Sequence, residues 1–271
     1  MWDLLIVQPL LNGLIIFYKI FGNLGVAIIL FTVAIRLLLT PLVLPSLKQM
    51  QKIKELAPHL ARLKARHQGD KMKLMQAQTD LYKQHGVNQM AGCLPQILQM
   101  VIFFGLFSVF NKVFSVANGG VSIDKLNELL WPILRLPTNA SIDMRFLYLH
   151  LAKPDIIPGL PIPLPGIIII ASAAALFISS KMMMPVITKE EELAKKTKGA
   201  ADDMAVSMQK SMLWMFPVMT LVFGFSFPSG LALFWFINSA FQVGQQYLVS
   251  GWGGMTPWIK HLGMLQSPHG R

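Results

Sequence analysis

The chain has 271 residues, of which 54% are hydrophobic and only 14% are charged, and its mean hydropathy is +0.52. This composition argues against a soluble domain and is typical of an integral membrane protein. The formal net charge is +11 and the isoelectric point is about 9.8. In a soluble protein this charge would suggest nucleic acid as a partner, but here the basic residues gather in a few segments and report membrane topology. Cys93 is the single cysteine, which excludes an internal disulfide and a metal site built from several cysteines.

Residues 1–22 are predicted to form an amphipathic helix that lies on the face of the membrane. Their uncharged run from Leu4 to Tyr18 has 15 residues, which is short for a spanning helix, and it is interrupted by Pro9 and Asn12. The alternative is a signal peptide. A signal peptide begins with basic residues, whereas the first charge here is that of Asp3.

Residues 23–45 are predicted to form the first membrane span, and they contain Arg36. The segment Gly25–Leu44 reads GVAIILFTVAIRLLLTPLVL and would be about 30 Å long as a helix, enough to cross a bilayer core. An arginine near the centre of such a helix costs about 2.5 to 3.5 kcal/mol on insertion scales, so it usually faces a polar cavity. The alternative is that Arg36 snorkels toward the polar segment that starts at Lys48.

Residues 46–90 are predicted to form a cytoplasmic helical hairpin. Pro58 suits the first turn of one helix, residues 67–70 make the turn, and a second helix runs through Met72, Met75 and Tyr82. The basic face would favour anionic lipid headgroups, acidic substrate segments or ribosomal RNA, and we expect it to take part in substrate capture. The methionines offer an adaptable apolar surface for the same purpose, and the alternative for them is ordinary packing. These side chains are Arg62, Lys64, Arg66, Lys71 and Lys73, with Met72 and Met75. The alternative for the charges is a solvated face that obeys the positive-inside rule.

The rest of the chain supplies four more predicted spans. The predicted segments are a second span at 91–115, an extracytoplasmic loop at 116–161, a third span at 162–185, a cytoplasmic loop at 186–210, a fourth span at 211–227, a fifth span at 229–249 and a cytoplasmic tail at 250–271. A tight turn at residues 227–230 joins the last two spans. Residues 129–151 are apolar in part, but they carry several charges and two prolines and are therefore predicted to be a loop.

The distribution of lysine and arginine predicts the orientation. Of the 24 such residues, nine lie at positions 46–90, six at 181–210 and two after position 250. Six lie in the segments on the opposite side, and Arg36 lies within a span. The positive-inside rule therefore puts the N-terminus outside and the C-terminus in the cytoplasm, as five spans require.

Two stretches of the sequence are the most specific, LYKQHGVNQMAGCLPQILQM (Leu81–Met100) and FPSGLALFWFINSAFQVGQQYL (Phe227–Leu248). Together with Arg36 and with FLYLHLAKPD (Phe146–Asp155), they resemble the YidC/Oxa/Alb family of membrane protein insertases. The resemblance extends over nearly the whole chain. We expect a compact form of the family, without the large periplasmic domain of its Gram-negative members.

The resemblance implies an all-α integral membrane protein whose five transmembrane helices surround a hydrophilic groove, closed to the outside and open to lipid and cytoplasm. The residues that it places in the groove are Arg36, Thr32, Gln96, Gln99, Trp235, Asn238 and Gln242. One position departs from the family, because Ser226 stands where an aromatic residue commonly precedes FPSG. For Asn238 and Gln242 the alternative role is hydrogen bonding between membrane helices.

The function implied is that of an insertase of the bacterial plasma (inner) membrane, which moves short polar or acidic substrate segments through the groove and releases apolar helices into lipid. It would need no enzymatic chemistry, cofactor or metal. Its partners would be newly made membrane proteins and the bilayer, with the ribosome and the Sec translocon as candidates, and no DNA.

The alternative function is a secondary transporter in which Arg36 pairs with an anionic solute. Such transporters show repeated halves, and the sequence shows no such repeat. An intramembrane hydrolase is disfavoured, because Phe227 stands where a nucleophile turn around Ser229 would need glycine, and the predicted spans hold no histidine. His59, His67 and His85 lack the spacing of a zinc site.

Overall fold

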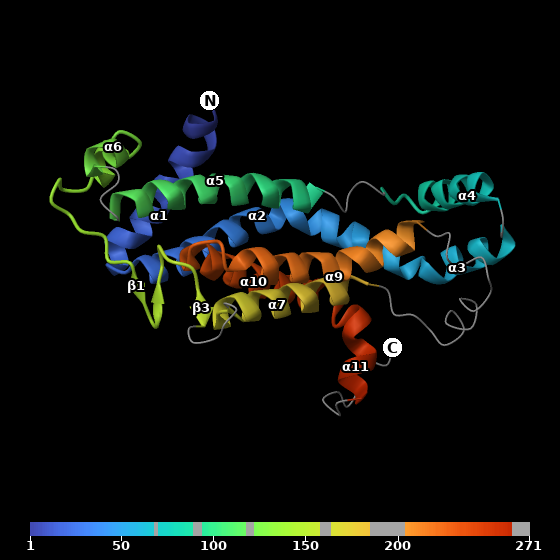
Figure 1. Ribbon diagram of the computed structural model, residues 1–271. Coiled ribbons are helices and arrows are strands. Elements are labelled where there is room, and N and C mark those ends of the chain that lie inside the picture. The colour runs from blue at the N-terminus through green and yellow to red at the C-terminus, as the bar shows by residue number, and fades with distance from the viewer. Residues whose placement is uncertain (68–69, 89–93, 118–121, 158–163, 185–203, 262–271) are drawn as a thin grey trace. The chain divides into compact units, whose positions relative to one another are not determined.

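The structure is a computed structural model that describes residues 1–67, 70–88, 94–117, 122–157, 164–184 and 204–261 (Figure 1). The longer helices are α1 (Gln8–Phe21), α2 (Leu24–Glu55), α3 (Ala57–Arg66), α4 (Lys71–Gln84), α5 (Leu94–Ala117), α7 (Ile167–Met183), α9 (Met204–Gly224) and α10 (Ser229–Ser250). The shorter ones are η1 (Asp3–Val7), α6 (Ile123–Asn127), η3 (Pro132–Leu134), η5 (Gly253–Met255) and α11 (Thr256–His261). Two antiparallel pairs of short strands complete the described residues, β1 (Arg145–Phe146) with β2 (Leu149–His150), and β3 (Ile156–Ile157) with β4 (Leu164–Pro165).

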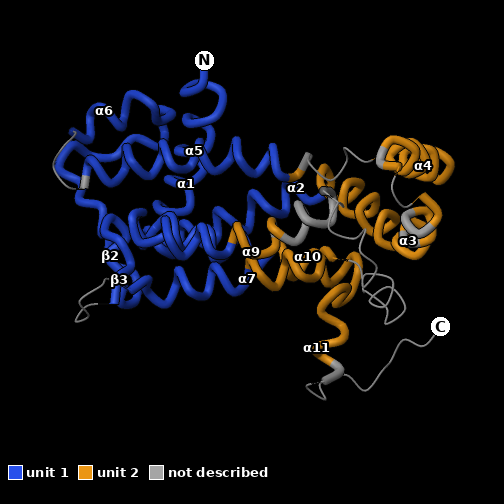
Figure 2. The backbone as a smooth tube through the Cα atoms, turned by 45° about the vertical axis from the view of Figure 1, so that its right-hand side comes forward, with its two compact units in different colours: residues 1–40, 96–175, 217–241 blue, residues 41–95, 176–216, 242–271 orange. Residues whose placement is uncertain are grey.

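The chain divides into two compact units, which Figure 2 distinguishes by colour. Unit 1 comprises Met1–Thr40, Gln96–Ala175 and Pro217–Phe241, and unit 2 comprises Pro41–Pro95, Leu176–Phe216 and Gln242–Arg271. Cys93 and most of the loop predicted at 186–210 lie outside the described residues.

Among the residues that the structure describes, three helices are long and apolar enough to cross a membrane, namely Asp3–Phe21, Leu24–Glu55 and Pro95–Val116. Two shorter apolar helices lie at Ile167–Met183 and Leu213–Gly224. Many of their outward side chains are large and apolar; Leu38 is 76% exposed, for example. Such a surface suits lipid rather than water. The chain is therefore an all-α membrane protein. Helix α2 continues through Pro41 and Pro45 to Glu55, beyond the predicted end of the first span, and prolines of this kind are tolerated in membrane helices.

The N-terminal helix is apolar on both faces. Val7, Leu11 and Leu14 are completely buried on one face, whereas Leu5 and Ile20, on the opposite side, are more than half exposed. An amphipathic helix at the membrane face would carry charges on its outer side. The continuous helix Asp3–Phe21 also has the length and hydropathy of a span, although the apolar run alone seemed too short. Its placement on the membrane face stays a prediction.

Hydrogen bonds of the Asn12 side chain link this helix to the segment after α6. The side chain of Asn12 is completely buried. Its Nδ2 donates to the carbonyl oxygens of Gln8 at 2.7 Å and of Leu129 at 3.1 Å, and its Oδ1 accepts from the backbone nitrogen of Trp131 at 2.7 Å. The asparagine that interrupts the apolar run is therefore a structural residue, because it pairs backbone groups of a segment far along the chain.

The predicted loop before the third span packs on the turn between α9 and α10. The backbone nitrogen of Ser229 donates to the carbonyl of Lys153 at 2.7 Å, and that of Gly230 donates to the carbonyl of Leu151 at 2.9 Å. The Ser229 hydroxyl donates to the carbonyl of His150 at 2.9 Å. The FLYLHLAKPD and FPSG motifs thus bind each other, and the hydroxyl of Ser229 has a structural role rather than that of a nucleophile.

The side chain of Asp155, the last residue of the FLYLHLAKPD motif, stabilises the start of helix α7. This side chain is only 5% exposed, and its Oδ2 accepts from the backbone nitrogen of Ile168 at 3.0 Å. This bond satisfies one of the free N–H groups at the start of the helix.

Unit 2 contains the helical hairpin of α3 and α4. Pro58 lies in the first turn of α3, where its missing N–H is harmless. Asp70 caps α4, because its Oδ1 accepts from the backbone nitrogen of Lys73 at 3.0 Å. Residues 68–69 of the predicted turn lie outside the described residues.

Candidate functional site: a partly buried arginine between three helices

Arg36 is the centre of a polar cluster inside unit 1. Its Nε donates to Oδ1 of Asn238 at 2.6 Å, and its Nη2 donates to Oε1 of Gln99 at 3.0 Å. The three residues come from α2, α5 and α10, so segments more than 60 positions apart converge on one guanidinium. The structure therefore brings together three of the seven residues expected to line a groove.

The partners of Arg36 are neutral amides. Within the part of the chain that the structure describes, no acidic side chain forms an ion pair with Arg36. A guanidinium carries five N–H donors, and the hydrogen bonds to Asn238 and Gln99 use two of them. A cation in apolar surroundings without a counter-ion attracts any carboxylate that can reach it, because the low dielectric strengthens the interaction.

Gln99 adds an unused donor to this cluster. Its Nε2 is buried and has no hydrogen-bond partner among the described residues. Leaving a buried amide N–H unpaired costs about 1 to 3 kcal/mol, so the cluster has room for an acceptor that the folded chain does not supply.

Thr32 and Gln96 do not bond to the cluster. Thr32 is only 1% exposed, and its hydroxyl donates to the carbonyl of Ile28 at 2.6 Å within its own helix. Gln96 lies in the first turn of α5 with an exposed side chain. Gln242 follows Asn238 by one turn of α10, is half-buried and belongs to unit 2.

Trp235 packs in an aromatic group on the side of unit 1 formed by α5 and α10. Its ring stacks on Phe103 with centroids 5.0 Å apart and meets Phe227 edge-on at 6.1 Å. Phe107, one turn beyond Phe103, also meets Phe227 edge-on, at 6.0 Å. Phe103 and Phe107 were not among the residues predicted from the sequence. Their spacing of four residues on an apolar helix was the available signal, but aromatic residues at that spacing are ordinary in helix packing.

The hairpin of unit 2 exposes part of the predicted capture surface. Met72 and Met75 are 74% and 61% exposed, and Arg62 and Arg66 are exposed as well. Lys73 is exposed too, although its Nζ lies 3.1 Å from Oδ2 of Asp70. The side chains of Lys64 and Lys71 lie outside the described ones.

Metal-binding chemistry has no support in the described residues. They contain no group of three histidine, cysteine, aspartate or glutamate side chains that could hold a metal ion. The His59 and His85 rings lie 6.2 Å apart between their centroids, without a third ligand beside them in this set.

The apolar helices and the partly buried polar cluster define an integral membrane protein with a cationic site between its helices. A model of the 60Kd inner membrane protein family matches residues 16–253, which is most of the chain. The chain therefore belongs to this family, and the resemblance to YidC/Oxa insertases seen in the sequence is confirmed. The family's description and the apolar helices identify it as an integral inner membrane protein.

Several relatives are similar over most of this chain. "Membrane protein insertase YidC" of Fusobacterium nucleatum is 31% identical over 85% of this chain and 88% of the relative. "Membrane protein insertase YidC" of Syntrophobacter fumaroxidans is 33% identical over 92% of this chain, which spans only 38% of that relative. "Membrane protein insertase MisCA" of Bacillus subtilis is 29% identical over 92% of this chain and 79% of the relative.

Proposed function

We propose that this protein is a membrane protein insertase that works without enzymatic chemistry. The observation that carries the proposal is Arg36, a cation between membrane helices whose bonded partners are the neutral amides of Gln99 and Asn238. The names of the relatives support the same function. Newly made membrane proteins would be the substrates, with the ribosome and the Sec translocon as candidate partners.

In this proposal five helices span the membrane, namely α2, α5, α7, α9 and α10. The lengths of α2, α5 and α10 and the apolar character of α7 and α9 support the arrangement. The basic segments at positions 46–90 and 181–210 support a cytoplasmic location for the loops that contain them. The N-terminus would then lie outside and the C-terminus in the cytoplasm.

The substrate would first meet the α3–α4 hairpin. Its exposed Arg62 and Arg66 attract acidic segments, while its exposed Met72 and Met75 offer an adaptable apolar surface. Such a surface can bind many unrelated sequences, as an insertase requires.

The acidic or polar segment would then enter a hydrophilic groove lined by Arg36, Thr32, Gln96, Gln99, Trp235, Asn238 and Gln242. Arg36 supplies opposite charge to a carboxylate, and the unpaired Nε2 of Gln99 donates a hydrogen bond that replaces one lost from water. Both contacts lower the cost of desolvation, which is the main barrier to moving a polar segment through a membrane.

The driving force would come from the substrate and the membrane potential. Moving one negative charge outward across an inside-negative membrane gains about 2.3 kcal/mol per 100 mV. Transfer of roughly 20 apolar residues of the substrate into lipid then makes release favourable. Nucleotide hydrolysis is unnecessary in this scheme.

Insertion into proteoliposomes tests the proposal. A single-span substrate with a short acidic tail is added to vesicles with and without the purified protein, and protection of the tail from external protease is measured. An insertase increases the protected fraction in the protein-containing vesicles. Equal protection in both kinds of vesicle would contradict the proposal.

A further inference from the structure

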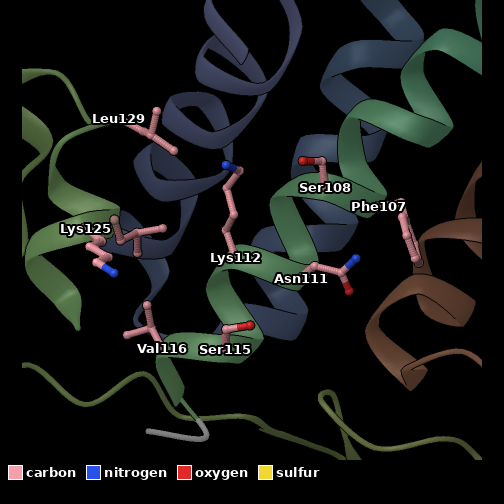
Figure 3. A pocket seen from close by; sticks show the side chains of 9 residues that line it. Phe107, Ser108, Asn111, Lys112, Ser115, Val116, Lys125 and Leu129 are labelled. Atoms are coloured by element: carbon pink, nitrogen blue, oxygen red, sulfur yellow. The ribbon is translucent and has the colours of Figure 1, made fainter. Parts of the chain in front are cut away.

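Unit 1 contains a second polar feature, a pocket of about 460 Å³ beside the last turns of α5. Its polar lining consists of Ser108, Asn111, Lys112 and Ser115 on α5, together with Lys125 on α6. Figure 3 shows the Lys112 side chain extended away from α5, with Ser108 on one side of it and the segment that carries Lys125 and Leu129 on the other. Ser108 follows Gln99 by nine residues, roughly 13 Å along a helix, so the pocket is separate from the Arg36 cluster.

The charge of this pocket is positive. Lys112 has one acidic neighbour, because its Nζ lies 3.6 Å from Oδ1 of Asp3, and that carboxylate is itself 59% exposed. Lys125 is exposed and forms no ion pair with a described residue. Asp124 and Glu128 lie on or next to α6 but do not line the pocket. The pocket therefore presents two ammonium groups with two hydroxyls and an amide, which are the donors that a phosphate group prefers.

The level of the pocket in the membrane favours a lipid over a soluble anion. The apolar helix that carries Lys112 ends at Val116, four residues later, which corresponds to about 6 Å. Residues this close to the end of a span lie near the headgroup region, where lysine side chains extend toward lipid phosphates. The remaining wall includes the apolar side chains of Val116, Leu126 and Leu129, so the lining is amphiphilic.

We propose that this pocket binds the phosphate headgroup of an anionic phospholipid, with Lys112 and Lys125 as its charge partners. In the topology proposed above the lipid belongs to the outer leaflet. The bound headgroup links α5 to α6, and it competes with Asp3 for the ammonium group of Lys112. Binding at this pocket does not depend on the insertase activity.

Native mass spectrometry of the full-length protein in detergent tests this proposal. The probes are short-chain phosphatidylglycerol, phosphatidylcholine with the same chains, and inorganic phosphate. The protein should bind phosphatidylglycerol more tightly than the other two. Equal binding of the two lipids, or displacement of phosphatidylglycerol by an equal concentration of inorganic phosphate, would contradict a site for an anionic lipid.

Variants locate the binding. Lys112→Gln and Lys125→Gln should each weaken phosphatidylglycerol binding about fivefold, because a lysine near a membrane surface contributes on the order of 1 kcal/mol. Asp3→Asn should strengthen it, because Lys112 loses its competing partner. Lys153→Gln is the matched control, since Lys153 is exposed and does not line the pocket. Asn111→Ala, at another exposed position, should weaken binding without disturbing the helix. Unchanged binding in the Lys112→Gln/Lys125→Gln double variant would overturn the proposal.

Discussion

The Nε of Arg36 donates to Oδ1 of Asn238 at 2.6 Å, although the two residues are 202 positions apart in the chain. Asn238 is only 6% exposed and Arg36 is partly exposed, so this bond is partly buried. A hydrogen bond to a charged group contributes about 1.5 to 3 kcal/mol, and its geometry orients the guanidinium without neutralising it. In the proposed function, the charge of Arg36 therefore remains available to a substrate.

Replacement of Asn238 by aspartate should suppress insertion of acidic tails. The new carboxylate would sit where the amide oxygen accepts from Arg36, and it would form an internal ion pair that competes with the substrate. We expect insertion of an acidic-tailed substrate to fall about tenfold, the equivalent of one charge-assisted hydrogen bond. The measurement is the rate of tail protection in proteoliposomes.

A substrate with a neutral tail is the control for this variant. Its insertion should change much less, since it has no carboxylate to lose from Arg36. A similar loss with both substrates would mean that Asn238→Asp disturbs the fold rather than the charge.

Replacement of Asn12 by alanine should loosen the N-terminal helix. The change leaves the carbonyl of Leu129 and the backbone N–H of Trp131 without their side-chain partner, at a cost of about 2 kcal/mol. Thermal unfolding in detergent should show a lower midpoint, and limited proteolysis should cut within residues 1–22 sooner. An unchanged cleavage pattern would show that Asn12 does not anchor this helix.

Two glycines of α10 should respond in opposite ways to alanine. A Cβ on Gly230 would lie 2.8 Å from Cζ of Phe114 and 3.3 Å from the carbonyl oxygen of Leu151, so Gly230→Ala should destabilise the protein by about 1 to 3 kcal/mol. Gly244 has no atom within 4 Å of such a Cβ, so Gly244→Ala should be neutral or stabilise the helix by up to about 1 kcal/mol. Comparison of the two unfolding midpoints checks both expectations. Equal shifts would argue against tight packing at the α9–α10 turn.

The start of α4 should loosen in acid. The hydrogen bond from the backbone nitrogen of Lys73 holds the pKa of Asp70 below its ordinary value, so the folded state favours the carboxylate. The resulting stabilisation of the folded state is complete above the ordinary pKa of aspartate. It is lost as the pH falls through the lowered pKa that Asp70 has in the folded state. Hydrogen-exchange protection of the first turn of α4, corrected for intrinsic rates, should fall in this range. Asp70→Asn, which can still cap the helix, should remove the pH dependence, and persistence of that dependence would assign it to another group.

The sequence indicated the helical class and the elements around Arg36 because their signals are local. An apolar run marks a membrane helix, and Pro58 marks the first turn of α3. The hydrogen bonds of the Asn12 and Asp155 side chains could not be predicted from local sequence, since each depends on a backbone group in a separate segment. The extension of α2 through Pro45 was also missed, because proline usually ends a helix in soluble proteins. The groove and the roles of its residues stay proposals.

The role of Arg36 can be tested by measuring insertion of a single-span substrate with an acidic tail into proteoliposomes that contain the wild type, Arg36→Ala or Arg36→Lys. We predict a loss of insertion with alanine and partial recovery with lysine, which keeps the charge but not the forked geometry. Neutralising the acid of the tail should reduce the difference between wild type and Arg36→Ala. Full insertion of the acidic tail by Arg36→Ala would contradict the claim that Arg36 is the charge partner of the substrate.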